Sequence, residues 1–569
     1  MRAVRAVAVA LALWQVAGAA PASGADERPT LYVARRIVTM DPEMPRATAV
    51  AVKNGRILDL GSILSVTATI GGGIKIDRTF ADLVLVPGFI DNHLHPGLAA
   101  MVLPGAVVGP EDWELAGGTA RGVRGRDAYR ARLRAHHEAL ADPQEWLVAW
   151  GYHPLFHGPL SRADLDAISK TRPIAVWHGS FHEIYANGAA LARWGLDEAR
   201  LAGHPGVDLA AGRFHGPGLA LALQALAPLI LDPERYAAGL REAGRLIHRS
   251  GITTVADQGL PLIDLEAELE LLQRVYGAGV PFRTLVVPNG LALGREQGDA
   301  WALARMEGLL RRSTPRVRFL RQVTLFADGA FHSQRMQMRR GYLDGRQGEW
   351  IMPPEALEAA ARVYWRAGWP IQVHANGDLG VQAALDVLER LSEQHPRRSH
   401  HFTLHHLGYF TEAQARRMAE LGALASANPF YLWALGDAYA ENGLGPARAH
   451  HIARIGSLLR HDVPVAFHSD LSLAPPQPLT LAWVAVNRLS SGGVLMAPKE
   501  RIGVGAALRA ITIDAARVLQ MDDEIGSITP GKRADFTVLE TSPYAVSPAE
   551  LRDIRIWGTV FEGRPHPID

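Results

Sequence analysis

The sequence contains no cysteine among its 569 residues. This absence excludes disulfides, thiolate nucleophiles, iron–sulfur clusters and cysteine-ligated zinc. Charge of one sign is also lacking, because 59 Lys+Arg against 58 Asp+Glu leave a formal net charge of +1. We therefore expect no general attraction for nucleic acid or for an anionic membrane. Any metal would have to be held by carboxylates and by some of the 23 histidines.

Long apolar runs are also scarce, and the one near the start is typical of a targeting signal. Arg2 and Arg5 precede an apolar run over residues 6–20, and small residues follow at 20–25. This order is typical of a secretory signal peptide, whereas a buried N-terminal helix would not explain the arginines and the small-residue exit together. We predict a signal peptide over residues 1–25, cleaved near Ala25. Later segments do not reach the ~20 uninterrupted apolar residues that a membrane span needs. With no cysteine for lipid anchoring, the mature protein is expected to be soluble and periplasmic or secreted.

The two ends of the chain have the same strand-and-turn character. Short alternating runs follow residue 26, and Asn54-Gly55 between two of them is a strong hairpin signal. The last part of the chain repeats this style, with strands separated by proline-containing loops. We predict a small β-sandwich domain formed by residues 26–86 together with 506–569, the latter also completing the central domain.

The central part alternates short apolar runs with helical segments such as Pro354–Ala367 and Leu379–Ser392, which is typical of a parallel α/β fold. Over residues 87–505 we predict a (β/α)8 TIM barrel with a large insertion, residues 98–250, after its first strand. The eight expected strands are Leu83–Ile90, Ile252–Ala256, Phe282–Val287, Phe319–Phe326, Pro370–Val373, Phe402–His405, Ala423–Ala427 and Pro464–Phe467.

Several of these strands end in histidine or aspartate. His93 and His95 follow the first strand, and residues two apart in a strand point to the same side. His374, His406 and Asp470 occupy the corresponding position after later strands. Any one of them alone is more often a core histidine or a capping aspartate. Because barrel enzymes carry their active sites at these strand ends, the repetition predicts a metal site that would suit zinc, iron, manganese or nickel.

The sequence resembles the amidohydrolase superfamily, and most closely its branch of N-substituted formamide deformylase-like proteins (amidohydrolase family 3). The resemblance spans nearly the whole mature chain. The matching motifs are Val86-Pro-Gly-Phe-Ile-Asp-Asn-His-Leu-His, His182 with Asn187-Gly-Ala-Ala-Leu, Phe326-Ala-Asp-Gly, His374 with Gly-Asp378, His406 with Ala419-Glu-Leu-Gly, His468-Ser-Asp470, Ile511-Thr-Ile-Asp-Ala-Ala-Arg-Val-Leu and Gly526-Ser-Ile-Thr-Pro-Gly-Lys-Arg-Ala-Asp-Phe.

The resemblance implies an enzyme that cleaves a carbon–nitrogen bond other than a peptide bond, using a metal-activated water. By position, it implies a metal shell of His93, His95, His374, His406 and Asp470. Asp470 would also shuttle a proton, a nearby histidine such as His406 would stabilise the oxyanion, and His182 of the insertion would face the substrate.

Two departures from the family pattern bear on the metal. Relatives with two ions carry a bridging lysine on the fourth strand, where this chain has Thr324. A threonine cannot form a carbamate, so we predict one Zn²⁺ held by His93, His95, His374 and Asp470, with His406 a ligand or a neighbouring donor. His405 stands where relatives have glutamate, and strand alternation predicts that its ring points away from the metal and packs behind it.

His332 also departs from the pattern, and it is expected either in the pocket or capping a helix. Insertion aromatics such as Trp177 and Phe181 are expected to form a local core rather than a substrate mouth. We expect a small-molecule substrate, no nucleic acid, no membrane association after signal cleavage, and we allow for a homodimer. Two alternatives stay open: a deaminase- or lyase-type reaction at the same site, and a non-catalytic metal- or ligand-binding protein on this scaffold.

Overall fold

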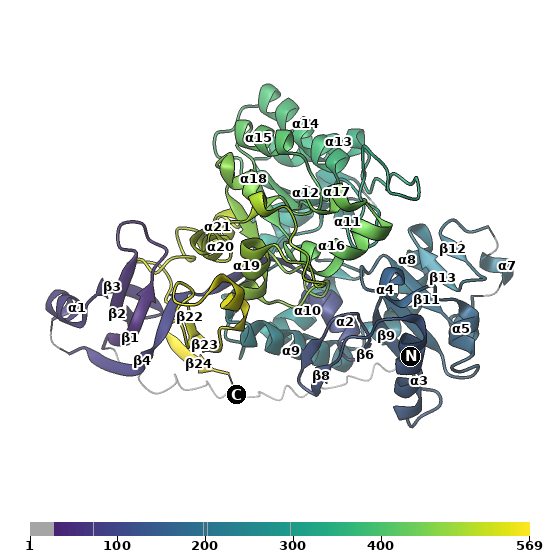
Figure 1. Ribbon diagram of the computed structural model, residues 1–569, viewed down its shortest axis with the longest axis horizontal. Coiled ribbons are helices and arrows are strands. Elements are labelled where there is room, and N and C mark those ends of the chain that lie inside the picture. The colour runs from purple at the N-terminus through teal and green to yellow at the C-terminus, as the bar shows by residue number, and fades with distance from the viewer. Residues whose placement is uncertain (1–27, 72, 197, 202, 296, 569) are drawn as a thin grey trace, which may run out of the picture.

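A computed structural model describes residues 28–71, 73–196, 198–201, 203–295 and 297–568, and it shows a mixed α/β protein (Figure 1). The predicted signal peptide and its cleavage site lie outside these residues. Within them, no helix combines the length and the apolar character needed to cross a membrane.

The strands from both ends of the chain form one sheet, drawn in purple and yellow in Figure 1. Its order is β24-β23-β22-β4-β1-β2-β3. The bounds are β1 Thr30–Val38, β2 Arg46–Lys53, β3 Arg56–Gly61, β4 Lys75–Pro87, β22 Phe536–Leu539, β23 Ile556–Phe561 and β24 Arg564–Pro567, with α1 Ile63–Ile70 after β3. The predicted hairpin is present: β2 and β3 pair antiparallel, and Asn54 and Gly55 both have the positive φ of a type I′ turn, 53° and 72°.

The first strand expected for the central domain, Leu83–Ile90, is two strands in the structure. β4 ends at Pro87 in the two-ended sheet, and β5, Phe89–Leu94, belongs to a parallel sheet. The chain changes sheets at Gly88, where a Cβ atom would lie 2.0 Å from Oγ1 of Thr253. A residue without a side chain is therefore needed where the two sheets meet.

The central strands form two parallel sheets, with orders β16-β15-β14-β5 and β17-β18-β19-β20-β21. A parallel bridge between Asn289 and Thr324 connects the segment after β15 to β17, and β21 contacts β5 at the other side. The expected strand Phe319–Phe326 is interrupted, and it forms the separate strands β16 and β17. The bounds are β14 Ile252–Asp257, β15 Arg283–Val286, β16 Val317–Phe319, β17 Val323–Phe326, β18 Ile371–Ala375, β19 Thr403–His406, β20 Leu424–Ala427 and β21 Val465–Phe467.

Helices alternate with these strands, as the sequence pattern predicts. The two amphipathic segments form α13, Pro354–Arg366, and α14, Asp378–Gln394, and each turns an apolar face inward. The other helices are α9 Pro233–Arg249, α10 Leu265–Tyr276, α11 Gly290–Gly294, α12 Asp299–Leu310, α15 Glu412–Glu420, α16 Phe430–Asn442, α17 Pro446–Ala449, α18 Ile455–Arg460, α19 Pro478–Asn487, α20 Val504–Ala510 and α21 Ile513–Val518, with 3-10 turns at Pro498–Glu500 and Pro548–Asp553.

The segment between β5 and β14 builds a third sheet, on the right of Figure 1, with order β12-β13-β11-β10-β9-β6. Its strands are β6 Ala106–Val107, β9 Leu147–Tyr152, β10 Ile174–His178, β11 Glu183–Ala186, β12 Val207–Asp208 and β13 Arg213–His215, beside the hairpin β7 Trp113–Leu115 and β8 Gly118–Ala120. Its helices are α2 Pro96–Val102, α3 Arg126–Ala139, α4 Pro154–His157, α5 Arg162–Asp166, α6 Gly188–Trp194, α7 Glu198–Leu201 and α8 Pro217–Ile230. Tyr129 and Tyr152 lie in a core cluster of this region alone, whereas Trp177 and Phe181 join the main core.

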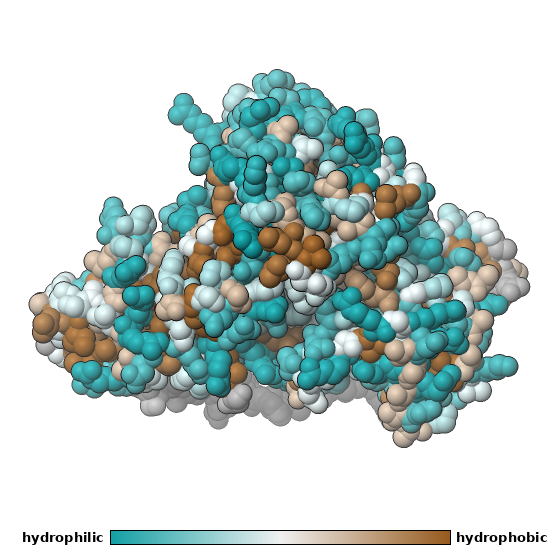
Figure 2. Space-filling model, in the orientation of Figure 1, coloured by the Kyte–Doolittle hydropathy of each residue, from teal (hydrophilic) through white to brown (hydrophobic). Residues whose placement is uncertain are grey.

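The surface in Figure 2 is largely hydrophilic over α13, α14 and α15. Hydrophobic atoms gather at the left end of the view, near α1, where Leu64 is 84% exposed.

Candidate metal centre

Three predicted ligands meet where β5 and β21 end. His93 is near the end of β5, His95 precedes α2, and Asp470 follows β21. Nε2 of His93 lies 3.3 Å from Nε2 of His95, and Oδ1 of Asp470 lies 3.7 Å and 3.3 Å from these two nitrogens. The Asp470 backbone N–H donates to the His93 carbonyl, which fixes the two strand ends together. His93, His95 and Asp470 therefore have the spacing of atoms that can share one metal ion.

A second triplet of possible ligand atoms consists of His93, His406 and His468. Nε2 of His468 lies 3.3 Å from Nδ1 of His406, which is 3.6 Å from Oδ2 of Asp470. His468 is absent from the ligand set that the sequence predicted, although its position at the end of a strand was a usable signal. The ring of His93 is common to both triplets.

His374, a predicted ligand, belongs to neither triplet. Its ring centre is 4.2 Å from that of His406, so it lies beside the cluster. However, its Nε2 is 2.9 Å from the amide nitrogen of Asn376, which donates to it. The side chain of Asn376 thus occupies Nε2 of His374.

The hydrogen bonds behind His93 determine which of its nitrogens is free. The Gln372 amide nitrogen donates to Oε1 of Gln322, so the Gln372 oxygen is left to accept from Nε2 of His405 at 2.5 Å. Nδ1 of His405 then accepts, and Nδ1 of His93 donates to it at 2.8 Å. Burial, with the nearby imidazoles, lowers the pKa of His405 to about 3, which keeps it neutral for this role. Nε2 of His93 therefore carries the lone pair and faces the cluster.

The same logic applies to His468. Ser426 donates its hydroxyl proton to Oδ1 of Asn92 at 2.5 Å, so the Ser426 oxygen accepts from Nδ1 of His468 at 2.8 Å. Nε2 of His468 is left unprotonated and directed toward His406. Such outer hydrogen bonds orient metal-binding histidines and increase their basicity.

The ring of His405 lies behind His93, as expected, with its centre 4.9 Å from that of His93. His406 has a φ of 72°, outside the strand region, so the alternation of sides assumed for neighbouring residues fails there. Both rings consequently lie next to His93.

Thr324, at the position of the bridging lysine, is buried and turned to another partner. Its hydroxyl donates to Oε1 of Gln258 at 2.8 Å, and the Gln258 amide donates to the Asn92 carbonyl. The structure thus gives this side chain a role in joining strands.

A cavity of about 310 Å³ opens above the cluster. Its polar end is lined by His93, His95, His374, His406 and Asp470. Apolar side chains from the insertion and the central loops line the rest; they include Leu98, Met101, Trp177, Phe181, Leu219, Leu223, Leu262, Ile263, Phe326, Ile351 and Leu473. Two of the insertion aromatics expected to serve only a local core therefore also face the cavity.

His182 and His332 line the same cavity. Nδ1 of His182 donates to the Ser180 carbonyl at 2.6 Å, which leaves its Nε2 as an acceptor. His332 precedes no helix and is buried, and its Nδ1 has no hydrogen-bond partner. Burial lowers the pKa of His332 to about 3. Of the two locations expected for His332, the structure therefore shows the one in the pocket.

The cluster leaves polar atoms without partners although they are buried. They are Nδ1 of His95, Nε2 of His406 and Oδ1 of Asp470. Unsatisfied buried polar atoms are costly and rare, so three of them around shared ligand atoms fit a site for a divalent cation. Nearby, burial raises the pKa of Asp257 to about 6 and that of Asp91 to about 7, and the Ser469 hydroxyl and N–H partly offset this for Asp91.

A buried His/Asp cluster at the ends of parallel strands, below an apolar cavity, defines a metal-dependent hydrolase. The chain belongs to the amidohydrolase family, whose profile matches residues 81–566. It is 28% identical to the protein LONG AFTER FAR-RED 3 of Arabidopsis thaliana, over 89% of this chain and 86% of that protein. It is 25% identical to the N-substituted formamide deformylase of Arthrobacter pascens, over 94% and 98%. The fold resembles that of a metal-dependent hydrolase from Pyrococcus horikoshii, with a TM-score of 0.70, 20% identity, and coverage of 91% of this chain and 99% of that one.

Proposed function

We propose that this protein hydrolyses an amide-type carbon–nitrogen bond of a small molecule, with Asp470 as the residue that moves the proton. The observation that carries the proposal is the position of Oδ1 of Asp470. It is buried without a hydrogen-bond partner, adjoins His93 and His95, and faces an apolar cavity. A purely structural metal site would need no group that moves a proton at the floor of a cavity.

We propose one zinc ion as the cofactor, held by His93, His95 and Asp470, with His406 as a further ligand. Imidazole and carboxylate are usual zinc ligands, and Thr324 is committed to Gln258 rather than to a second ion. A bound divalent metal supplies Lewis acidity and lowers the pKa of a coordinated water from about 15.7 toward 7. His374 would join only by giving up its contact with Asn376.

The chain's own side chains supply the remaining steps. Asp470 accepts a proton at Oδ2, because Oδ1 lies beside His93 and His95 and would bind the metal. It returns this proton to the leaving nitrogen, which needs a proton to depart as an amine. His182 and His406 lie at the cavity wall. Nε2 of His182 can accept a hydrogen bond from an N–H of the substrate, whereas His406 can donate to the carbonyl oxygen of the substrate only where its ring is not bound to the metal. The apolar walls orient the rest of the substrate and exclude bulk water.

We also infer that the two parallel sheets are arcs of one (β/α)8 barrel. The barrel would close where the edges of the two sheets meet, which the bridge between Asn289 and Thr324 and the contact between β21 and β5 support. Likewise, Phe80 and Phe536 lie in a separate core of the two-ended sheet, which supports a sandwich. Export with cleavage near Ala25 is proposed from the sequence pattern alone.

Metal analysis beside a screen of formamides, linear amides and cyclic amides tests the proposed function. We expect about one zinc per chain, loss of at least 100-fold in turnover after chelation, and recovery when zinc is returned. Activity that survives complete metal removal would contradict the mechanism, and a content near two ions would contradict the single site. Ammonia release from ring-amino compounds without any amide hydrolysis would assign a deaminase instead.

A further inference from the structure

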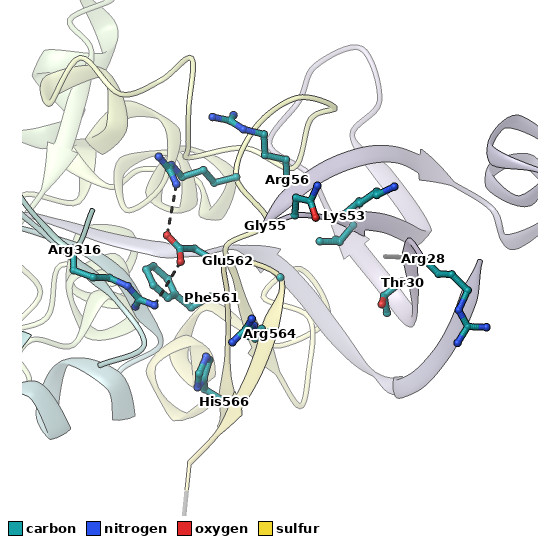
Figure 3. A pocket seen from close by; sticks show the side chains of 14 residues that line it. Arg28, Thr30, Lys53, Gly55, Arg56, Arg316, Phe561, Glu562, Arg564 and His566 are labelled. Carbon is teal, nitrogen blue, oxygen red and sulfur yellow. Dashed lines mark ion pairs between the residues drawn. The ribbon is translucent and has the colours of Figure 1, made fainter. Parts of the chain in front are cut away.

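A cavity of about 620 Å³, larger than the one at the metal centre, lies where the two-ended sheet meets the central domain (Figure 3). Two hairpin tips form its walls: Asn54-Gly55 between β2 and β3, and Glu562-Gly563 between β23 and β24. The tips touch, since a Cβ atom on Gly55 would lie 3.3 Å from the Glu562 carbonyl oxygen. Arg316, just before β16, adds a wall from the amino-terminal end of the central strands, opposite the metal centre.

The lining of this cavity is strongly cationic. It includes one acidic residue, Glu562, and six basic ones: Arg28, Lys53, Arg56, Arg316, Arg533 and Arg564. These leave an excess of five positive charges, although the whole chain has a formal net charge of only +1. Positive charge is thus concentrated in a cavity that has no part in the proposed reaction.

The acidic residue is shared among several arginines and cannot neutralise the cavity. The Glu562 carboxylate lies 3.5 Å from Arg316 and 3.6 Å from Arg533, the two ion pairs dashed in Figure 3. It also lies 3.8 Å from Arg283. The Arg283 and Arg316 guanidiniums lie 4.9 Å and 4.5 Å from the centre of the Phe561 ring. These contacts hold the floor of the cavity in place before any ligand arrives.

Two other cationic side chains of the cavity remain available to bind a ligand. Lys53 and Arg564 are exposed, and neither forms an ion pair within the described part of the chain. Lys53 and Arg564 repel one another as like charges, and a bound anion relieves this repulsion. Guanidinium groups match phosphate oxygens in paired hydrogen bonds, and a lysine adds a point charge.

We propose that this cavity binds a ligand bearing two or more phosphate groups. Its volume and the spread of its cations over both hairpins and the central domain suit a polyphosphate better than a single phosphate ion. The ligand could be a soluble polyphosphate or the headgroups of anionic phospholipids, which present the same chemistry. The site is independent of the amide hydrolysis, because it lies at the other end of the central strands.

Calorimetric titration of the purified full chain with inorganic tripolyphosphate tests the site. We expect one binding site whose affinity falls at least tenfold between 50 and 300 mM NaCl. The double variant K53Q/R564Q should lose at least a further tenfold at 50 mM. Because both side chains are exposed and unpaired, its thermal unfolding should match that of the wild type.

The matched control is K170Q/R311Q, which removes the same charge from exposed positions outside the cavity. Its affinity should stay within twofold of the wild type. Equal losses in both double variants would show diffuse attraction only and would overturn the proposal, as would the absence of binding to both tripolyphosphate and vesicles.

Vesicles of phosphatidylcholine with and without phosphatidylglycerol distinguish the two sources. Retention on the anionic vesicles, lost in K53Q/R564Q and displaced by tripolyphosphate, would identify headgroups as the ligand. Tripolyphosphate binding without vesicle retention would identify a soluble ligand.

Discussion

The metal centre and the cationic cavity both gather nitrogen-bearing side chains, but they place them in opposite surroundings. At the metal centre His93, His405, His406 and His468 are buried, and burial lowers the pKa of His405 and His374 to about 3, which keeps these rings neutral. At the cavity the guanidinium and ammonium groups are largely solvated and stay charged. The comparison teaches that the kind of nitrogen group and its burial together decide whether a site attracts a cation or an anion.

The largest effect is expected when the Asp470 carboxylate is removed from the metal centre. Asp470→Asn keeps an oxygen but loses the charge and the basic site, so turnover of the hydrolysed amide should fall by about 10³-fold or more. Steady-state kinetics at saturating zinc measure this. Asp462→Asn, the same change at an exposed site eight residues earlier, should leave turnover unaltered. Full turnover in Asp470→Asn would remove the proton-shuttle role.

A smaller effect is expected behind the metal centre. His405→Gln disturbs the hydrogen bond that keeps Nε2 of His93 unprotonated, so zinc affinity should fall about 10- to 100-fold. Competition with a zinc chelator measures it, and turnover should largely return at saturating zinc. His400→Gln replaces another buried histidine in the same segment, one bonded to the Leu421 carbonyl, and should leave zinc affinity unchanged. If both variants lose zinc equally, the hydrogen-bond chain has no special role.

The smallest expected effect is on stability, and it contrasts arginines paired with a buried carboxylate with the unpaired cations of the cationic cavity. Glu183 is buried and bonded to Arg213 at 2.7 and 2.8 Å and to Arg335 at 3.2 Å. Although burial opposes its charge, the Arg213 hydrogen bonds, His178 and the arginine charges together lower the Glu183 pKa well below its ordinary value. Glu183→Gln should therefore reduce the free energy of unfolding by about 2 kcal/mol at pH 7.

The pH dependence of this effect follows from the direction of the pKa shift. A carboxyl group with a lowered folded-state pKa stabilises the protein above its unfolded pKa, and this stabilisation is lost as the pH falls toward the folded value. The difference between wild type and Glu183→Gln should thus be constant above about pH 5 and shrink below about pH 4.3. Denaturant titrations across this range measure it. Lys53→Gln should change stability by less than about 0.5 kcal/mol throughout, and a constant Glu183 difference down to pH 2 would contradict the assignment.

The sequence predicted those features that follow from local periodicity. His93, His95 and Asp470 meet because each lies near or just after the end of a buried strand, and Asn54-Gly55 forms its hairpin because few other pairs suit a type I′ turn. The relative roles of His374 and His468 could not be predicted in this way. They depend on which neighbour occupies each ring nitrogen, Asn376 or Ser426, and those contacts exist only after the strands are assembled.

Two larger features were also not predicted, because they too depend on contacts between distant segments. The change of sheet at Gly88 depends on the close approach of Thr253, about 165 positions away in a separate strand. The cationic cavity unites residues from Arg28 to Arg564, so no window of sequence contains it. Local patterns therefore predicted the strand ends but not how distant segments meet.

The two-ended sheet has a consequence for how the chain is made. β4 pairs with β1 nearby, but its other edge pairs with β22, as in the contact of Leu85 with Val538. Until that late segment has been synthesised, β4 presents an unpaired edge of the kind that recruits other chains. A polypeptide that stops before residue 536 would lack β22, β23 and β24 and would leave this edge of β4 unpaired and open to association with other chains.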